Sequence, residues 1–444
     1  MLRLRWFDRE PDDLSAPVDW RFAASIIATL FLNFSFWIAN ASDLWMSCSL
    51  PLYAVHVGVV ALLIAALFFV GPALAAQASA RPLFSAVENS LGSIPAYGVR
   101  FCCVLFLLAW TAKSIAWAEL WPLHIIQPRG WSPIESGAIG IGLMGFLAFA
   151  SLQSVQTTAT LALFINKLGA AILIAALICV HHGWPAVLRA SPVSTVRPEG
   201  LELWQGLSQL AFYLAPSVFL AASFGYRSAG RKTVAMTALM GIAAPLAGTL
   251  ILVGIIGIAT MESGFYVPSL EPNVAMALWS HAASSALPGL MMLAAITAFG
   301  AIRFGIRSLV ESASIRPLGR RWTLVLLGFL AGAILLVSAD PYAPTFDLLT
   351  NVLAVVPAVL MADFVTRSWR VDPVRRFDWI GVIALLAGLA TLYVPGWIVG
   401  ADDSQWWHAW LLPSYGVAFL ACLLGRTVRR FRSTAKNILD TAVQ

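Results

Sequence analysis

The chain has 444 residues, of which 59% are hydrophobic and only 11% are charged. Soluble domains carry about 25% charged residues, so this composition argues against a water-soluble fold and predicts an integral membrane protein. The formal net charge of +6 does not indicate nucleic-acid binding, because the basic residues gather in a few connections between apolar segments. We expect a lipid bilayer around the chain and no nucleic-acid partner.

The chain begins with a polar segment and then alternates between long apolar runs and short connections. Residues 1–20 lack the apolar region and small-residue cleavage site of a signal peptide, so we expect a retained N-terminal tail. A bilayer core requires about 20 apolar residues per helix. This criterion predicts about 12 transmembrane helices, near 22–45, 53–76, 97–120, 136–152, 159–180, 204–225, 234–259, 286–306, 322–338, 346–365, 379–394 and 409–425.

Arginine and lysine are distributed unequally between the two sets of connections. One set is rich in basic residues, as in Arg227–Lys232 and in the loop that holds Arg367, Arg370, Arg375 and Arg376. The opposite set holds few basic residues and is marked by acidic ones such as Asp402 and Asp403. By the positive-inside rule, both termini are cytoplasmic and the protein lies in the plasma membrane, which is the inner membrane in a bacterium.

Polar residues and a proline interrupt two helices that are five spans apart. The first predicted helix contains Phe34, Phe36, Trp37 and Asn40 among other interruptions, and the sixth contains Tyr213, Pro216 and Ser217. Unwound backbone is tolerated at membrane depth where it lines a cavity, and an odd number of spans inverts direction in the membrane. The pattern favours a 5+5 inverted repeat over ordinary packing with a tolerated proline kink. The implied segments are 21–180, 204–366, two peripheral helices in 378–425 and a cytoplasmic tail at 426–444.

The third predicted helix places aromatic and hydroxyl residues on one face. Phe106, Trp110 and Ser114 recur at a spacing of four residues. Such a face can stack on a planar heterocycle and read its polar edge, although the same spacing is also typical of helix packing.

Two lysines fall inside predicted spans, where a charge must face protein or water. Lys113 lies near the middle of the third helix, either paired between helices or linked to protons or substrate. Lys167, in the fifth helix, can reach the cytoplasmic surface by snorkelling, or it can act at an ion site.

Two motifs carry a resemblance to a known family. The first is Pro357–Phe364, which contains Asp363, followed by a basic loop, Asp378-Trp379 and finally Pro395-Gly396-Trp397. The second is Arg81-Pro82-Leu83-Phe84 followed by Gly92-Ser93-Ile94-Pro95. Together they resemble the nucleobase–cation symporters, the family of cytosine permease. For Asp363, we expect pairing with Arg367 at the cytoplasmic rim, with gating of the inner mouth as the alternative.

The resemblance implies an all-α, LeuT-type fold with a core of two inverted five-helix repeats and two peripheral helices. It also implies a secondary transporter of a small neutral heterocycle, such as cytosine, another nucleobase or a pyrimidine precursor. In that family a tryptophan stacks on the base, and Trp110 matches it in either of two alignments, paired with Phe106 or with Ser114.

The resemblance also bears on which ion is coupled to transport. In sodium-coupled relatives the eighth helix carries adjacent hydroxyl residues, whereas here Thr297 alone retains one. A hard cation requires several oxygen ligands, so we favour a proton over sodium as the coupled ion. Lys167 lies on the helix that borders the sodium site in this fold, where a lysine ammonium can replace the ion.

Two other functions remain open from the sequence. One is an amino-acid or amine permease of the same fold, and the other is a membrane sensor that binds its ligand without transport. The sequence shows no paired carboxylates, metal-spaced histidines or nucleophile with a base. We therefore expect neither an enzyme nor a metal or cofactor site.

Overall fold

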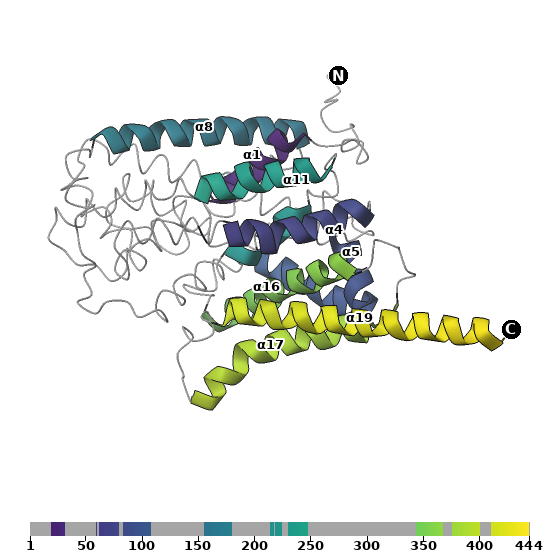
Figure 1. The fold of residues 1–444 in the computed structure, drawn as a ribbon. Coiled ribbons are helices and arrows are strands. Elements are labelled where there is room, and N and C mark those ends of the chain that lie inside the picture. Colours follow the sequence, from purple (N-terminus) through teal and green to yellow (C-terminus); the bar gives the residue numbers. More distant parts are fainter. Residues whose placement is uncertain are drawn as a thin grey trace, which may run out of the picture. The chain divides into compact units, whose positions relative to one another are not determined.

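The computed structural model describes residues 19–31, 59, 62–79, 83–107, 155–179, 214–216, 218–223, 230–246, 343–366, 375–399 and 410–443 (Figure 1). These residues form helices and turns, and no strand occurs among them. The elements are α1 (Trp20–Phe31), the π-helix η1 (Ile64–Val70), α4 (Gly71–Ser79), α5 (Leu83–Leu91), α8 (Val155–Cys179), α11 (Arg231–Ala238), the π-helix η4 (Leu239–Ala243), α16 (Ala343–Thr366), α17 (Trp379–Val399) and α19 (Leu411–Val443). A further apolar helix spans Ser93–Leu107. The all-α prediction agrees with every described element, while the 12-helix count remains a prediction.

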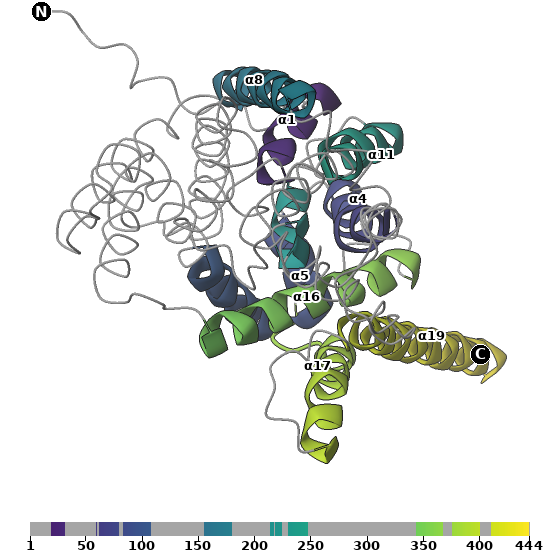
Figure 2. The ribbon, with the colours of Figure 1, turned by 90° about the vertical axis from the view of Figure 1, so that its left-hand side faces the viewer.

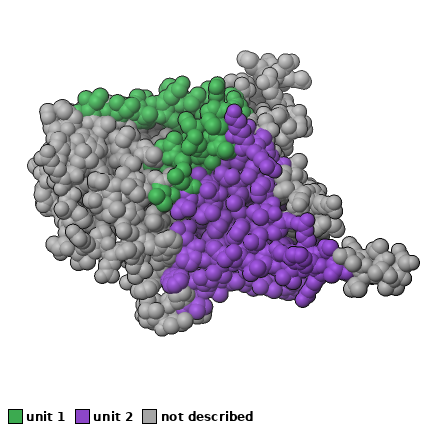
Figure 3. All heavy atoms as spheres, in the orientation of Figure 1, with its two compact units in different colours: residues 1–62, 104–200, 235–345 green, residues 63–103, 201–234, 346–444 purple. Residues whose placement is uncertain are grey.

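The chain divides into two compact units (Figure 3). Unit 1 contains residues 1–62, 104–200 and 235–345, and unit 2 contains residues 63–103, 201–234 and 346–444. Each unit draws on both halves of the sequence. The boundaries of the two predicted repeats therefore remain predictions.

The C-terminal helices follow the apolar segments predicted from the sequence. Within the described residues, two helices are long and apolar enough to cross a bilayer, at Leu349–Thr366 in α16 and Leu411–Ala435 in α19. The predicted span 379–394 lies in α17. The span predicted to end at residue 425 belongs to a longer helix, because α19 continues to Val443. Hydropathy thus located these helices but did not locate the end of the last one.

In unit 1, the N-terminal helix α1 packs against α8 and η4. One face of α1 is buried, with Ile26 and Ile27 almost fully enclosed. Gly241 in η4 permits a close approach, since a Cβ atom there would lie 3.1 Å from the Ala24 Cα atom. The small residues on both sides therefore allow close backbone packing.

In unit 2, α17 packs against α19, and the two helices lie next to one another in Figures 1 and 2. The Ser414 hydroxyl on α19 donates a hydrogen bond of 2.6 Å to the Gly388 carbonyl on α17. The Tyr415 hydroxyl donates to the Leu67 carbonyl at 2.8 Å, and its ring meets Phe68 edge-on at 5.2 Å. Leu67 lies in η1, and a π-helix disturbs the regular hydrogen-bond ladder. Tyr415 therefore supplies a partner to a backbone group within that irregular turn.

Gly388 lies where three helices of unit 2 meet, and its replacement by alanine is expected to destabilise the protein. A Cβ atom there would lie 2.6 Å from Val355 Cγ1 on α16 and 2.9 Å from Ala418 Cβ on α19. Overpacking of this kind costs about 1–3 kcal/mol. Thermal unfolding of the purified protein in detergent measures the loss.

The matched control is Gly416→Ala on α19, where an added Cβ atom meets nothing within 4 Å. Alanine there is expected to be neutral or to stabilise the helix by about 0.5–1 kcal/mol. Equal apparent melting temperatures for the two variants would contradict the proposed close contact at Gly388.

Candidate functional site

A tight corner at Gly92 joins α5 to the Ser93–Leu107 helix. α5 ends with a hydrogen bond of 2.9 Å from the Gly92 N–H to the Glu88 carbonyl, and the Gly92 carbonyl accepts the Ala96 N–H at 3.2 Å. Gly92 has a φ of 93°, a conformation that favours glycine because it has no Cβ atom. One helix therefore ends and the next begins at a single residue, inside the Gly92-Ser93-Ile94-Pro95 motif.

The segment that precedes α17 is docked onto this corner through backbone groups. The Ser93 and Ile94 N–H groups donate to the carbonyls of Arg375 and Arg376, at 2.9 and 3.2 Å. The first N–H groups of a helix have no partner within it, so these two carbonyls cap the Ser93–Leu107 helix. In return, the Asp378 N–H donates to the Leu91 carbonyl at 2.9 Å.

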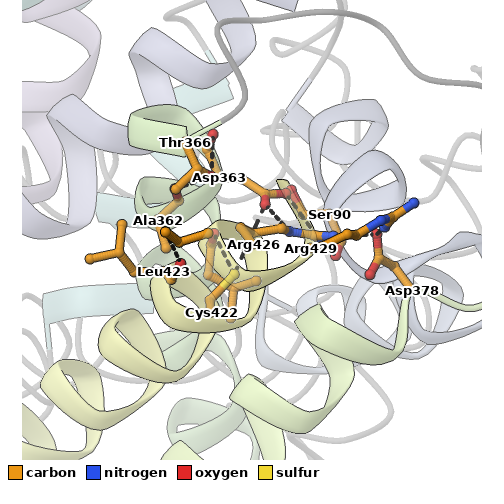
Figure 4. Close-up of polar contacts among 11 residues, drawn as sticks. Ser90, Ala362, Asp363, Thr366, Asp378, Cys422, Leu423, Arg426 and Arg429 are labelled. Carbon is orange, nitrogen blue, oxygen red and sulfur yellow. Dashed lines mark hydrogen bonds and ion pairs between the residues drawn. The ribbon is translucent and has the colours of Figure 1, made fainter. Parts of the chain in front are cut away.

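A buried arginine on α19 connects the corner to two carboxylates (Figure 4). Arg426 Nε donates to Asp363 Oδ1 and Nη1 donates to Asp378 Oδ2, each at 2.7 Å, while Nη2 donates to the Ser90 carbonyl at 3.1 Å. Arg426, Asp363 and Asp378 are only 4–5% exposed. Buried charges require partners and hydrogen bonds, and this geometry provides both.

The Arg426 network, defined as Ser90, Asp363, Asp378 and Arg426, joins four helical segments. Ser90 lies in α5, Asp363 near the end of α16, Asp378 immediately before α17 and Arg426 in α19. Its two carboxylates outnumber its one guanidinium. Arg429, one turn further along α19, brings Nη1 to 4.0 Å from Asp378 Oδ2 and is 39% exposed. Arg429, which lies at the edge of the network, thus offsets the remaining negative charge.

Sequence reasoning identified both carboxylates but missed Arg426. Asp363 was expected to pair with Arg367, which lies outside the described residues, and the partner seen for it is Arg426. In the sequence, Arg426 is the first residue of the segment predicted to be a cytoplasmic tail, 426–444. The missed signal is periodicity, because Arg426 continues the buried face of α19 formed by Leu411, Tyr415, Ala418 and Cys422.

Few of the predicted substrate and ion residues lie in the described part of the chain. Phe106 is in the last turn of the Ser93–Leu107 helix and is fully buried. Pro216 is buried within helical residues 214–216. The following predicted residues lie outside the described ranges: Phe34, Phe36, Trp37, Asn40, Trp110, Lys113, Ser114, Tyr213, Ser217 and Thr297. Their grouping around a substrate remains a prediction.

Lys167 lies on α8, and its side chain is exposed. The neighbouring residue Asn166 contacts α1, since its Nδ2 atom donates to the Ser25 carbonyl at 2.9 Å. The amide of Asn166 therefore links α8 to α1 in unit 1. A role for the Lys167 ammonium at an ion site stays a prediction.

No family model matches the sequence, and no curated protein matches it. The structure is similar to that of Mhp1, a nucleobase-cation-symport-1 family transporter, in a closed conformation with bromovinylhydantoin bound. That match has a TM-score of 0.67 and 12% sequence identity, and it covers 95% of this chain and 94% of Mhp1.

Two other solved transporters are similar over most of their length. A substrate-bound, outward-open Na+-coupled sialic acid symporter has a TM-score of 0.61 and 11% identity, with 93% of this chain and 90% of the symporter covered. A manganese transporter from Eremococcus coleocola has a TM-score of 0.53 and 12% identity, with coverage of 93% and 95%. The chain therefore has the LeuT-type fold of these integral membrane transporters, as the sequence predicted.

Proposed function

We propose that the protein is a secondary transporter that moves a small neutral heterocycle across the membrane by alternating access. The observation that carries this proposal is the match to Mhp1, which extends over nearly the whole of both chains. A match of that extent covers nearly the full length of a solved transporter, which supports the proposal. The alternative that the chain is an enzyme has no comparable support, because the solved structures similar to it are transporters.

The substrate class is inferred from two independent sources. The sequence motifs around Gly92 and Asp378 resemble those of the nucleobase–cation symporters, and Mhp1 was solved with a substituted hydantoin bound. Hydantoins and nucleobases are both planar rings with polar edges, which aromatic side chains can hold by stacking. We infer that Trp110, with Phe106 or Ser114 beside it, provides the stacking surface.

The coupled ion is proposed to be a proton. Thr297 is the only hydroxyl residue in the segment that carries adjacent hydroxyls in sodium-coupled relatives. One hydroxyl with backbone carbonyls makes an incomplete shell for a hard cation. Uptake that rises steeply with sodium, at fixed pH and fixed membrane potential, would contradict this inference.

Uptake of radiolabelled compounds into proteoliposomes tests the function directly. A panel of cytosine, uracil, purines and hydantoin is expected to include at least one substrate that also shows counterflow. An aromatic contact contributes about 0.5–1.5 kcal/mol beyond its buried area, and about 1.4 kcal/mol is a tenfold effect. We therefore expect Trp110→Ala to raise the half-saturating concentration about tenfold.

The matched control is Trp397→Ala, because Trp397 lies in α17, one of the predicted peripheral helices. This variant is expected to transport with unchanged affinity. Unchanged affinity in Trp110→Ala as well would place the site elsewhere. Competition by amino acids instead of pyrimidines would identify an amino-acid permease, and saturable binding without counterflow would identify a sensor.

A further inference from the structure

Two segments of unit 2 expose basic and aromatic side chains together, and we call them the basic rim. The first precedes and begins α17, with Arg375, Arg376, Phe377 and Trp379; the second lies in α19, with Arg430, Phe431 and Arg432. Trp379 is 66% exposed and Phe431 is 71% exposed. The rings of Phe377 and Trp379 stack on one another, with centroids 5.4 Å apart and an interplanar angle of 13°.

The two segments lie next to one another because α17 and α19 are tied at this end. Arg426 and Arg429 both approach the Asp378 carboxylate, at 2.7 and 4.0 Å. Gly425 passes so close to α17 that a Cβ atom there would lie 2.7 Å from Ile380 Cγ2. The residues that flank Asp378 are therefore adjacent to the turn of α19 that follows Arg426.

The exposed charge of the basic rim is positive. Two acidic side chains close to it, Asp363 and Asp378, are buried and bonded to Arg426. Their negative charge is thus offset inside the protein. The four exposed arginines of the rim, Arg375, Arg376, Arg430 and Arg432, can face an external partner.

The rim also lies at the depth of lipid headgroups if α19 spans the bilayer. The buried, paired Arg426 marks the end of the apolar part of this helix. With a rise of about 1.5 Å per residue, positions 430 to 432 lie about 6–9 Å beyond it. The headgroup layer on each side of the hydrocarbon core is about 5–7 Å thick. Positions 430 to 432 therefore lie near the outer edge of that layer, and their long arginine side chains can turn back to reach the headgroups.

We propose that the basic rim binds an anionic phospholipid of the cytoplasmic leaflet. Guanidinium groups bind phosphate oxygens through paired N–H donors, and exposed aromatic rings are stabilised where headgroups meet acyl chains. Clusters of basic residues directly next to a membrane span are typical of sites for anionic lipids. The rim supplies both parts, with the stacked Phe377–Trp379 pair and Phe431 beside four exposed arginines.

Native mass spectrometry of the full-length protein in detergent tests this proposal. The protein is titrated with phosphatidylglycerol and phosphatidylcholine that carry the same acyl chains. The wild type is expected to retain phosphatidylglycerol about tenfold more tightly, and added salt should reduce the difference. Arg430→Gln/Arg432→Gln is expected to lower this preference severalfold, by removing two headgroup contacts.

The control is Arg231→Gln/Lys232→Gln, which removes the same charge from exposed positions at the start of α11. It is expected to keep the lipid preference. Equal retention of the two lipids by the wild type, or an unchanged preference in the Arg430/Arg432 variant, overturns the proposal. Equal loss in the control variant also overturns it, since general charge would then explain the effect.

Two further experiments distinguish lipid binding from binding of a free anion or of a second copy of the chain. Glycerol 3-phosphate and inorganic phosphate, added in excess, are expected not to displace the lipid, because they lack the acyl chains that the exposed rings would contact. Displacement by either would identify a free-anion site instead. A dimer that survives without lipid and is lost in Arg430→Gln/Arg432→Gln would show that the rim holds a second copy of the chain. Because the readout is lipid binding, it is independent of whether transport is detected.

Discussion

Replacing Arg426 with methionine is expected to destabilise the protein by about 3–5 kcal/mol, because it leaves two buried carboxylates without their shared partner. Asp363 and Asp378 each receive a 2.7 Å hydrogen bond from this side chain, and both are almost inaccessible to solvent. The Ser90 carbonyl loses a donor as well. The apparent Tm of the purified protein in detergent should fall by at least about 5 °C.

Two comparisons separate the loss of charge pairing from the loss of packing. Arg430→Met removes an exposed arginine from the next turn of the same helix and is expected to leave the Tm close to that of the wild type. Adding Asp363→Asn and Asp378→Asn to Arg426→Met removes the buried charges, so much of the lost stability should return. If Arg426→Met behaved like Arg430→Met, the network would contribute little to the stability of unit 2.

The second large effect is expected at Gly92. Its φ of 93° is strained for any residue with a Cβ atom, which costs about 1–3 kcal/mol. An added Cβ atom would also lie 2.7 Å from Phe377 Cα and 2.8 Å from the Arg376 carbonyl oxygen. Both are backbone atoms, which cannot rotate away as a side chain can. Gly92→Ala should therefore cost about 3 kcal/mol or more and lower the Tm accordingly.

Gly98→Ala provides the control, in the helix that follows Gly92. Gly98 has nothing within 4 Å of the position of a Cβ atom, and alanine favours a helix over glycine. This substitution is expected to leave the Tm unchanged or to raise it slightly. Similar Tm values for Gly92→Ala and Gly98→Ala would show that the corner tolerates a different backbone conformation.

The sequence predicted the C-terminal helices well because their signal is local. Apolar runs near 346–365 and 379–394 locate α16 and α17, since hydropathy depends only on residues within a single span. The end of α19 was not predicted. Hydropathy falls after Gly425, whereas residues 426–443 contain no glycine or proline and continue the helix. Hydropathy therefore predicts where a helix leaves the bilayer, whereas the helix itself ends only where the residues no longer favour it.

The Arg426 network could not be predicted by the same reasoning. Asp363 and Asp378 stood out as polar residues beside apolar helices, but their partner lies 63 and 48 positions further along the chain. An arginine near the end of a span is usually explained by the positive-inside rule. Hydropathy and charge alone do not distinguish a buried arginine such as Arg426 from an exposed one such as Arg430. The periodicity of α19 places Arg426 on its buried face, but only the tertiary arrangement shows which carboxylates it meets.

The position of Arg426 in the sequence also determines when the Arg426 network can form during synthesis of the protein. A ribosome synthesises the chain from its N-terminus, so Ser90, Asp363 and Asp378 all exist before Arg426 leaves the exit tunnel. Until then, two carboxylates beside the bilayer lack the guanidinium that neutralises them. The Arg426 network can therefore form only after α19 has been synthesised and inserted. A chain in which the network has formed has thus been translated through α19.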